Sequence, residues 1–388
     1  MHTSTALRQQ TDNILRSHIV PFGLFLFLTG MFWIGDRSDF HRIFYILVAF
    51  PTTLALAVTP QNIWKPFNGI FLCALAFCSY TALTLLWSGT DRAASALKHS
   101  LYVILIFYAF TLPSLKQIRQ IINASLIFAT LSALISIAYF LYFDPQHRLP
   151  GYGALYNPLL TSHVYGMFSA ISLSYLFLTN EKKWIWTVCF IVLTTLLLLT
   201  GSRTPLLALG ASLLWLTLVT FNRRSIFLFS AGLALGFLLF FFDPEIFTNR
   251  GLSYRPDIWR EAWLQIIKNP LWGHGYDHPM AFKVEGIRYT FADPHNLFLA
   301  VLFSGGILGL GLWFILYAVA IGFAWRNRSD LFVIAASTAV IFGLTAGITE
   351  GKAFISRPKE HWFLIWIPLS LLAATWFYKK NNTLEKFK

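Results

Sequence analysis

The chain has 388 residues, of which 12% are charged, 56% hydrophobic and 17% aromatic. Soluble domains carry roughly 25% charged residues, so this composition excludes a water-soluble globular protein and indicates an integral membrane protein. The formal net charge is +13, yet the sequence holds no basic domain, and we therefore expect no nucleic-acid partner.

Twelve stretches of the chain approach the roughly 20 mostly apolar residues that cross a hydrocarbon layer as a helix. They lie at 19–34, 43–58, 67–87, 97–113, 121–143, 159–179, 184–200, 205–221, 225–242, 296–324, 331–349 and 361–378. Gly, Pro and charged residues mark the gaps between them. We therefore predict an all-α integral membrane protein of about twelve spans, built as a single polytopic domain over residues 1–388.

The three cysteines, Cys73, Cys78 and Cys189, all fall inside predicted spans. Their number is odd and their spacing matches no metal site, so neither a disulfide framework nor a zinc centre is implied. We expect no cofactor and no metal.

The distribution of charge between the links predicts the orientation of the chain. The side that holds the N-terminus carries fifteen of the 30 Lys and Arg residues but only four of the 17 Asp and Glu residues. This excess is the positive-inside pattern, which places both termini on the cytoplasmic side of an inner membrane. The longest link, 243–295 between the ninth and tenth spans, is then a periplasmic loop. No ATP is available there, so a substrate must arrive already activated.

The long loop contains an amphipathic helix, which Pro256-Asp257 can begin and Asn269-Pro270 ends. Its apolar face is predicted from residues that recur at i, i+3, i+4 and i+7 spacing. They are Trp259, Ala262, Trp263, Ile266 and Ile267. We expect this face to rest on the bilayer or on the helix bundle.

Two arginines are predicted at membrane-surface depth on the outer face. Arg255 precedes Pro256, which favours an extended backbone beside a helix N-terminus with free N–H groups. Arg203 lies in the very short link Gly201–Pro205 between two spans. Two arginines beside helix N-termini suit a diphosphate, and Arg260 on the amphipathic helix is a weaker candidate. The alternative is that these side chains reach up to the phosphates of membrane lipids.

The segment Asp293-Pro294-His295-Asn296 stands where the long loop enters the tenth span. Neutral imidazole is a common general base near pH 7, and His295 is placed where a water-borne hydroxyl meets a lipid-borne phosphate ester. Asp293 is a candidate to orient it. The alternative is that His295 is only an interfacial polar anchor.

Other histidines are weaker candidates for chemistry. His274 and His278, with Asp277 and His295, are conceivable metal ligands. The Gly and Pro residues around them argue against a shared helical face, and no carboxylate cluster lies nearby. His163, near the outer end of its span, is predicted to be an anchor or a lipid contact.

Three places in the sequence resemble the O-antigen ligase family and the related O-antigen polymerases. His295 and Asn296, followed at the expected spacing by Gly306 and Gly309, are similar to the family's outer-loop pattern. Arg255-Pro-Asp-Ile-Trp259 with the later Pro270-Leu-Trp-Gly-His-Gly275 is similar to the family's loop helix and its glycine turn. The link at Arg203 resembles the family's short arginine link.

The resemblance implies a GT-C-like architecture and a metal-independent, inverting glycosyl transfer. The donor would be a polysaccharide on undecaprenyl diphosphate, and the acceptor a sugar of the lipid A core. His295 would deprotonate or position the acceptor hydroxyl, while Arg203 and Arg255 would hold the diphosphate. Arg260 and Asn296 are further residues that we expect to bind substrate.

Related activities remain open at this point. An O-antigen polymerase or a protein O-oligosaccharyltransferase would share these motifs, although the absence of a second long outer loop favours the ligase. A lipid-linked glycan transporter is the alternative from another class. It predicts ionisable residues near mid-membrane, whereas Asp, Glu, Lys and Arg fall in the predicted links or span ends.

Overall fold

The computed structural model describes residues 2–143, 147–221, 223–242 and 254–386. Residues 243–253, the first part of the predicted long loop, lie outside this range. The described part is helical apart from short turns and one two-stranded hairpin, β1 (Phe282–Lys283) with β2 (Thr290–Phe291), which pair antiparallel. The predicted all-α membrane fold is confirmed.

The described first half of the chain is largely helical. Its helices are α1 (His2–Ile14), α2 (Val20–Thr29), α3 (Arg37–Ile43), α4 (Phe50–Val58), α5 (Gly69–Leu83), α6 (Ala93–Thr111) and α7 (Leu115–Phe143). A π-helical turn joins α1 to α2 at Leu15–Ile19, and another joins α3 to α4 at Phe44–Ala49. Each pair therefore continues as one long rod.

The second half supplies the centre of the bundle and the functional loops. Its helices are α8 (Pro158–Leu178), α9 (Lys183–Leu199), α10 (Arg203–Thr220), α11 (Arg223–Phe242), α13 (Arg255–Ile266), α14 (Leu297–Arg326), α15 (Leu331–Ala346), α16 (Glu360–Leu364) and α17 (Trp366–Lys386). Of the described helices, eight are long and apolar enough to cross a membrane. The other four predicted stretches coincide with α8, α9, α11 and α15, and the total of twelve crossings stays a prediction.

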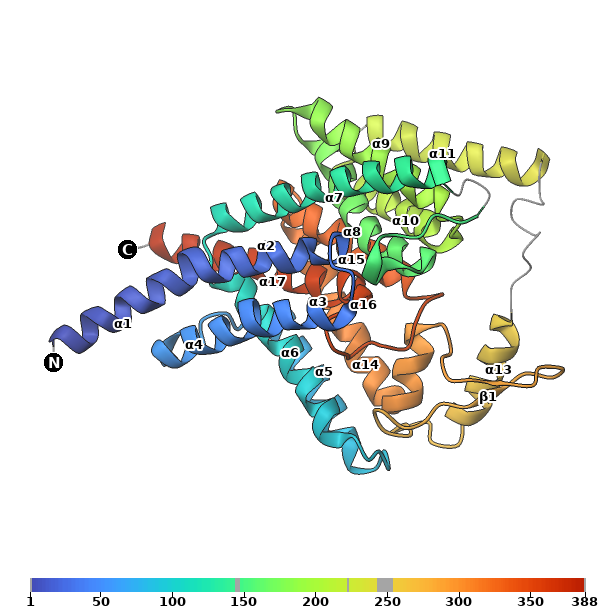
Figure 1. Cartoon of the computed structure of the whole chain (residues 1–388), viewed down its shortest axis with the longest axis horizontal. Helices are drawn as coiled ribbons and strands as arrows, with labels where there is room; N and C mark the ends of the chain where they lie inside the picture. The colour runs from blue at the N-terminus through green and yellow to red at the C-terminus, as the bar shows by residue number, and fades with distance from the viewer. Residues whose placement is uncertain (1, 144–146, 222, 243–253, 387–388) are drawn as a thin grey trace.

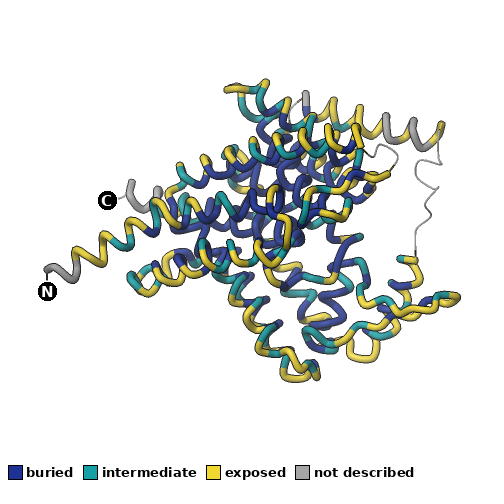
Figure 2. The backbone as a smooth tube through the Cα atoms, viewed as in Figure 1, coloured by how far each residue is buried: buried dark blue, intermediate teal, exposed yellow. Residues whose placement is uncertain are grey.

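The core of the bundle is formed by α8, α15 and the α16–α17 pair. Every residue of α8 from Thr161 to Tyr175 is buried, whereas the outer helices keep exposed apolar faces (Figure 2). Small residues allow the close approach, because a Cβ at Gly343 would lie 1.7 Å from the carbonyl oxygen of Leu364. Lipid tails are as apolar as leucine, so such close backbone packing is a main source of helix association in membranes.

His163 belongs to this core, and its predicted contact with lipid is wrong. Its side chain is 1% exposed, and its ring centroid lies 5.4 Å from that of His361 in α16. The residue lies near the N-terminal end of α8, which the other helices surround on all sides. Hydropathy locates a span but does not show whether it faces lipid or protein.

Helix α14 is broken at Gly306, where φ is 61° and ψ is −164°. This backbone conformation is essentially restricted to glycine. The turn Pro270–Gly275 packs into the break, where the N–H groups of His274 and Gly275 donate to the carbonyls of Phe303 and Ser304 at 2.8 and 2.9 Å. In return, the N–H of Ile307 donates to the carbonyl of Pro270 at 2.8 Å. The break therefore fixes the loop to the bundle.

Helix α13 packs against α14 and the hairpin with a face that overlaps the predicted one in Ala262 and Ile266. The buried residues are Ile258, Ala262 and Ile266, which join Phe282 and Phe303 in a small separate core. Trp263 and Ile267 are 53% and 50% exposed. The sequence alone did not show that Ile258 completes the buried face while Trp263 and Ile267 stay exposed.

Figure 1 shows both termini at one end of the bundle, with α13 and the hairpin toward the opposite end. An even number of crossings requires the two termini to share a side. The described loop residues therefore lie away from the ends of the chain, and the predicted orientation in the membrane stays a prediction.

We predict that Gly306→Ala destabilises the docked loop, while Gly311→Ala on the same helix does not. A Cβ at Gly306 would lie 2.2 Å from the carbonyl oxygen of Leu271 and would force a side chain into a positive-φ conformation. We expect a loss of about 3 kcal/mol. A Cβ at Gly311 meets nothing within 4 Å.

The test is thermal unfolding in detergent, combined with limited trypsin cleavage at the exposed Lys268, Lys283 and Arg288. Gly306→Ala should melt earlier and be cleaved faster than the wild type. Equal behaviour of the two glycine variants would show that the break in α14 does not hold the loop.

Candidate active site

The link that carries Arg203 is a tight turn held by a second arginine. Helix α9 ends at Leu199, and α10 begins at Arg203, whose side chain is exposed. Arg148 donates hydrogen bonds to the carbonyl oxygen of Thr200 and to the hydroxyl of Ser202, both at 2.7 Å. The predicted short link is present, and Arg148 fixes its shape.

Arg255 forms an ion pair with Glu350, with 2.9 Å between Nη2 and Oε1. Glu350 lies in the 347–359 segment that joins α15 to α16, and it is 2% exposed. The extended backbone predicted for Arg255 is wrong, because Arg255 is the first residue of α13 and Tyr254 precedes the helix. Pro256 is tolerated as the second helical residue, since the first-turn N–H groups have no partner within the helix.

Thr204 connects this ion pair to the arginine link. Its hydroxyl lies 3.3 Å from the Glu350 carboxylate and 2.7 Å from the hydroxyl of Thr349. Thr204 directly follows Arg203 in the first turn of α10. The backbone that carries Arg203 is therefore tied to the carboxylate that holds Arg255.

Glu350 titrates near neutral pH. Burial raises its pKa from an ordinary 4.5 to about 7, and the nearby charge of Asp293 acts in the same direction. The Arg255 guanidinium and the Thr204 hydroxyl oppose this rise but do not cancel it. The strength of the Arg255–Glu350 pair therefore depends on pH in the physiological range.

His295 occupies a strained turn at the start of α14. Its φ is +48°, a left-handed conformation that side chains rarely adopt. The carboxylate of Asp293 accepts a hydrogen bond from the backbone N–H of His295 at 2.7 Å. Asp293 thus fixes the turn through the main chain.

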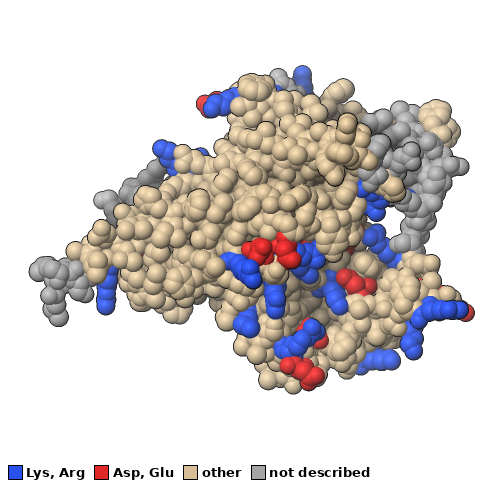
Figure 3. Space-filling view, viewed as in Figure 1, with Lys and Arg blue, Asp and Glu red and all other residues tan. Residues whose placement is uncertain are grey.

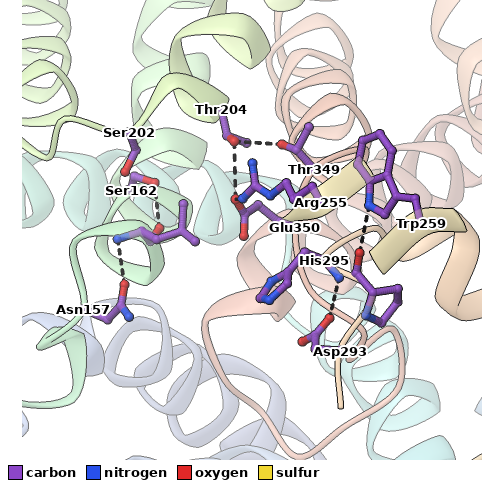
Figure 4. A network of polar contacts seen from close by, with 12 residues as sticks. Asn157, Ser162, Ser202, Thr204, Arg255, Trp259, Asp293, His295, Thr349 and Glu350 are labelled. Atoms are coloured by element: carbon purple, nitrogen blue, oxygen red, sulfur yellow. Dashed lines mark hydrogen bonds and ion pairs between the residues drawn. The ribbon is translucent and has the colours of Figure 1, made fainter. Parts of the chain in front are cut away.

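Two further hydrogen bonds bring His295 to the ion pair. The indole Nε1 of Trp259, one helical turn after Arg255, donates to the carbonyl of Pro294 at 2.9 Å. The N–H of Leu297 donates to the carbonyl of Gly347 at 2.8 Å, just before Thr349 and Glu350. Figure 4 shows the His295 imidazole close to Arg255 and Glu350. The structure thus gathers His295, Arg255 and the start of α10 at one place.

The two weaker candidates for substrate binding have different surroundings. Arg260 is exposed on α13, one turn beyond Pro256. Asn296 caps α14, because its side-chain oxygen accepts the N–H groups of Phe298 and Leu299 at 2.9 and 3.1 Å. That oxygen is therefore engaged in holding the helix on which His295 depends.

His274 and His278 dock the loop. His274 Nε2 lies 2.9 Å from the carbonyl oxygen of Gln265, and His278 Nδ1 lies 2.8 Å from that of Ser88. Their rings stack with centroids 5.4 Å apart. Within the part of the chain that the structure describes, no three His, Cys, Asp or Glu side chains gather as a metal site.

Sequence reasoning missed Glu350, Thr204 and Arg148. Glu350 had a signal, because a lone carboxylate stands directly after a predicted span, at a depth where charge is unfavourable without a partner. Thr204 and Arg148 had none, since both act through contacts with residues distant in sequence.

Fold and site together define a multi-pass membrane protein with a cationic and histidine-containing site at one end of its bundle. A family model described as O-antigen ligase matches residues 188–314, a range that contains Arg203, Arg255 and His295. A curated O-antigen ligase of Pseudomonas aeruginosa is 46% identical over 385 residues, covering 96% of this chain and 94% of that protein. The chain belongs to the O-antigen ligase family.

We predict that protonation of Glu350 stabilises the fold. Its pKa is raised in the folded state, so its contribution to stability is fully present below about pH 4.5 and is lost as the pH rises through about 7. Glu350→Gln should remove this dependence. The measurement is the difference in melting midpoint between wild type and Glu350→Gln from pH 5 to 8. Taking the difference removes the pH dependence that other titrating groups give to both proteins.

Arg255→Ala is the matched variant for this measurement. Because Arg255 lowers the pKa of Glu350, its removal should move the loss of stability to higher pH. A midpoint difference that stays constant across the range would contradict the raised pKa.

Proposed function

We propose that this protein transfers a polysaccharide from undecaprenyl diphosphate to a sugar hydroxyl of the lipid A core at the periplasmic face of the inner membrane. The observation that carries the proposal is the joining of Arg255, the Arg203 link and His295 by side-chain and backbone contacts. Membership of the O-antigen ligase family supports the same activity.

In this mechanism the diphosphate is the leaving group. Arg203 and Arg255 bind its oxygens, as guanidinium groups do for phosphates, and stabilise the negative charge that develops when the bond from the sugar to oxygen breaks. Glu350 orients Arg255 without neutralising it fully, because burial keeps the carboxylate partly protonated near pH 7. No metal ion is needed to neutralise the diphosphate in this scheme.

His295 acts on the acceptor. Its imidazole accepts the proton of the acceptor hydroxyl while that oxygen attacks the anomeric carbon from the face opposite the diphosphate. One glycosidic bond forms, the bond to the diphosphate oxygen breaks with its electron pair, and the configuration inverts. The docked turn between Asp293 and His295 keeps the base at a fixed position.

We predict that His295→Asn and Arg255→Ala abolish O-polysaccharide attachment in a deletion strain complemented with each variant. Asparagine tolerates the left-handed backbone at position 295 but cannot accept the proton, so the turn is kept and the base is lost. We expect a loss of at least about a hundredfold for each variant. Arg203→Ala should behave like Arg255→Ala.

The readout is a lipopolysaccharide profile together with the amount of lipid-linked polysaccharide. Inactive variants should leave the core uncapped while polysaccharide accumulates on its carrier. Lys268→Ala, an exposed residue just after α13, is the control and should match wild type. A core capped with a single repeat would instead indicate a polymerase, and normal capping by His295→Asn would remove the base from the mechanism.

A further inference from the structure

A cavity of about 230 Å³ lies beside the candidate active site, between the start of α6, the loop after α13 and the 347–359 segment. This volume corresponds to about eight water molecules. Arg92, His99, Tyr276, Lys352 and Lys359 are among its lining residues. None of the residues assigned to glycosyl transfer above lines it.

A second cavity of about 210 Å³ adjoins the first, and the two share Ser95 and His99. Among the described residues, the charged side chains that line the pair are five cations and one carboxylate. They are Arg92, Lys98, Lys352, Arg357 and Lys359 against Asp277. Figure 3 shows Lys and Arg atoms below the centre of the view, with clusters of Asp and Glu atoms among them.

Contacts within the protein leave most of this positive charge uncompensated. Asp277 already binds Arg92 at 3.1 Å and the hydroxyl of Thr90 at 2.8 Å. Glu360, next to Lys359, pairs with Arg37 at 2.5 Å. Lys359 is half-buried, and this burial lowers its pKa. The other four cations are exposed, so the cavity combines one half-buried cation with a rim of exposed ones, an arrangement that favours binding of an anion.

The cavity borders the turn that carries His295. Lys352 lies two residues after Glu350, lines the cavity and donates a hydrogen bond to the carbonyl of Ala292. Ala292 is three residues before His295. A group bound in the cavity is therefore separated from the proposed base by the width of one loop.

We propose that this cavity binds a phosphate group carried by a sugar of the acceptor. The inference rests on the proposed function, in which Arg203 and Arg255 hold the donor diphosphate and the acceptor hydroxyl meets His295. A second anion site, linked to the His295 turn through Lys352 and lined by different cations, fits the second substrate. A phosphate seated there would position the neighbouring hydroxyl for attack.

The test is a transfer assay with purified full-length protein, lipid-linked polysaccharide as donor and lipid A core as acceptor. The acceptor is used intact or after removal of its phosphates with hydrogen fluoride. For wild type, dephosphorylation should raise the KM for the acceptor about tenfold. This is the loss of affinity expected when one charge-assisted hydrogen bond is removed. The KM for the donor should not change.

Lys359→Ala and Arg357→Ala should raise the KM for the intact acceptor and make the enzyme insensitive to dephosphorylation. Lys359→Arg, which keeps the charge, should restore the preference for the phosphorylated acceptor. Lys283→Ala on the exposed hairpin is the control and should behave as wild type. This pattern distinguishes lost anion binding from a general folding defect.

Equal KM values of wild type for the two acceptors would overturn this inference while leaving the proposed transfer activity intact. A rise in the donor KM of Lys359→Ala would assign the cavity to the donor and would overturn it as well. If wild type transferred to neither acceptor, the proposed function itself would fail.

Discussion

The break of α14 at Gly306 is the constraint on which the rest of the structure depends. A continuous helix would satisfy its own backbone groups and leave no acceptor for the turn Pro270–Gly275. At the break, the carbonyls of Phe303 and Ser304 become available and are used by the loop. Backbone hydrogen bonds in a water-poor environment are costly to lose, so the loop is held on the bundle at the point where α13 and His295 must meet.

The candidate site is held together by hydrogen bonds and an ion pair between segments that are distant in sequence. Trp259 joins α13 to the His295 turn, Arg255 joins α13 to Glu350, and Thr204 joins Glu350 to α10. Each link passes through the 347–359 segment or the turn before α14. A displacement of either segment would therefore change the diphosphate side and the base together.

The sequence predicted the elements well and their contacts poorly. Apolar length located twelve helical stretches, and the chemistry of His295, Arg203 and Arg255 made them candidates that the structure brings near one another. Glu350 was missed because its partner, Arg255, is 95 residues away in sequence and the pairing arises only from tertiary packing. The buried face of α13 was predicted only in part for the same reason, since Ala262 and Ile266 are buried as expected but tertiary packing adds Ile258 and leaves Trp263 exposed.

The left-handed backbone of His295 has a consequence for how this position can change. Glycine or asparagine would occupy that turn with less strain, so the fold alone favours replacing the histidine. If the imidazole is the base, stability and chemistry select for different residues at the same site. Substitutions chosen only to raise the melting temperature would then tend to remove activity here first.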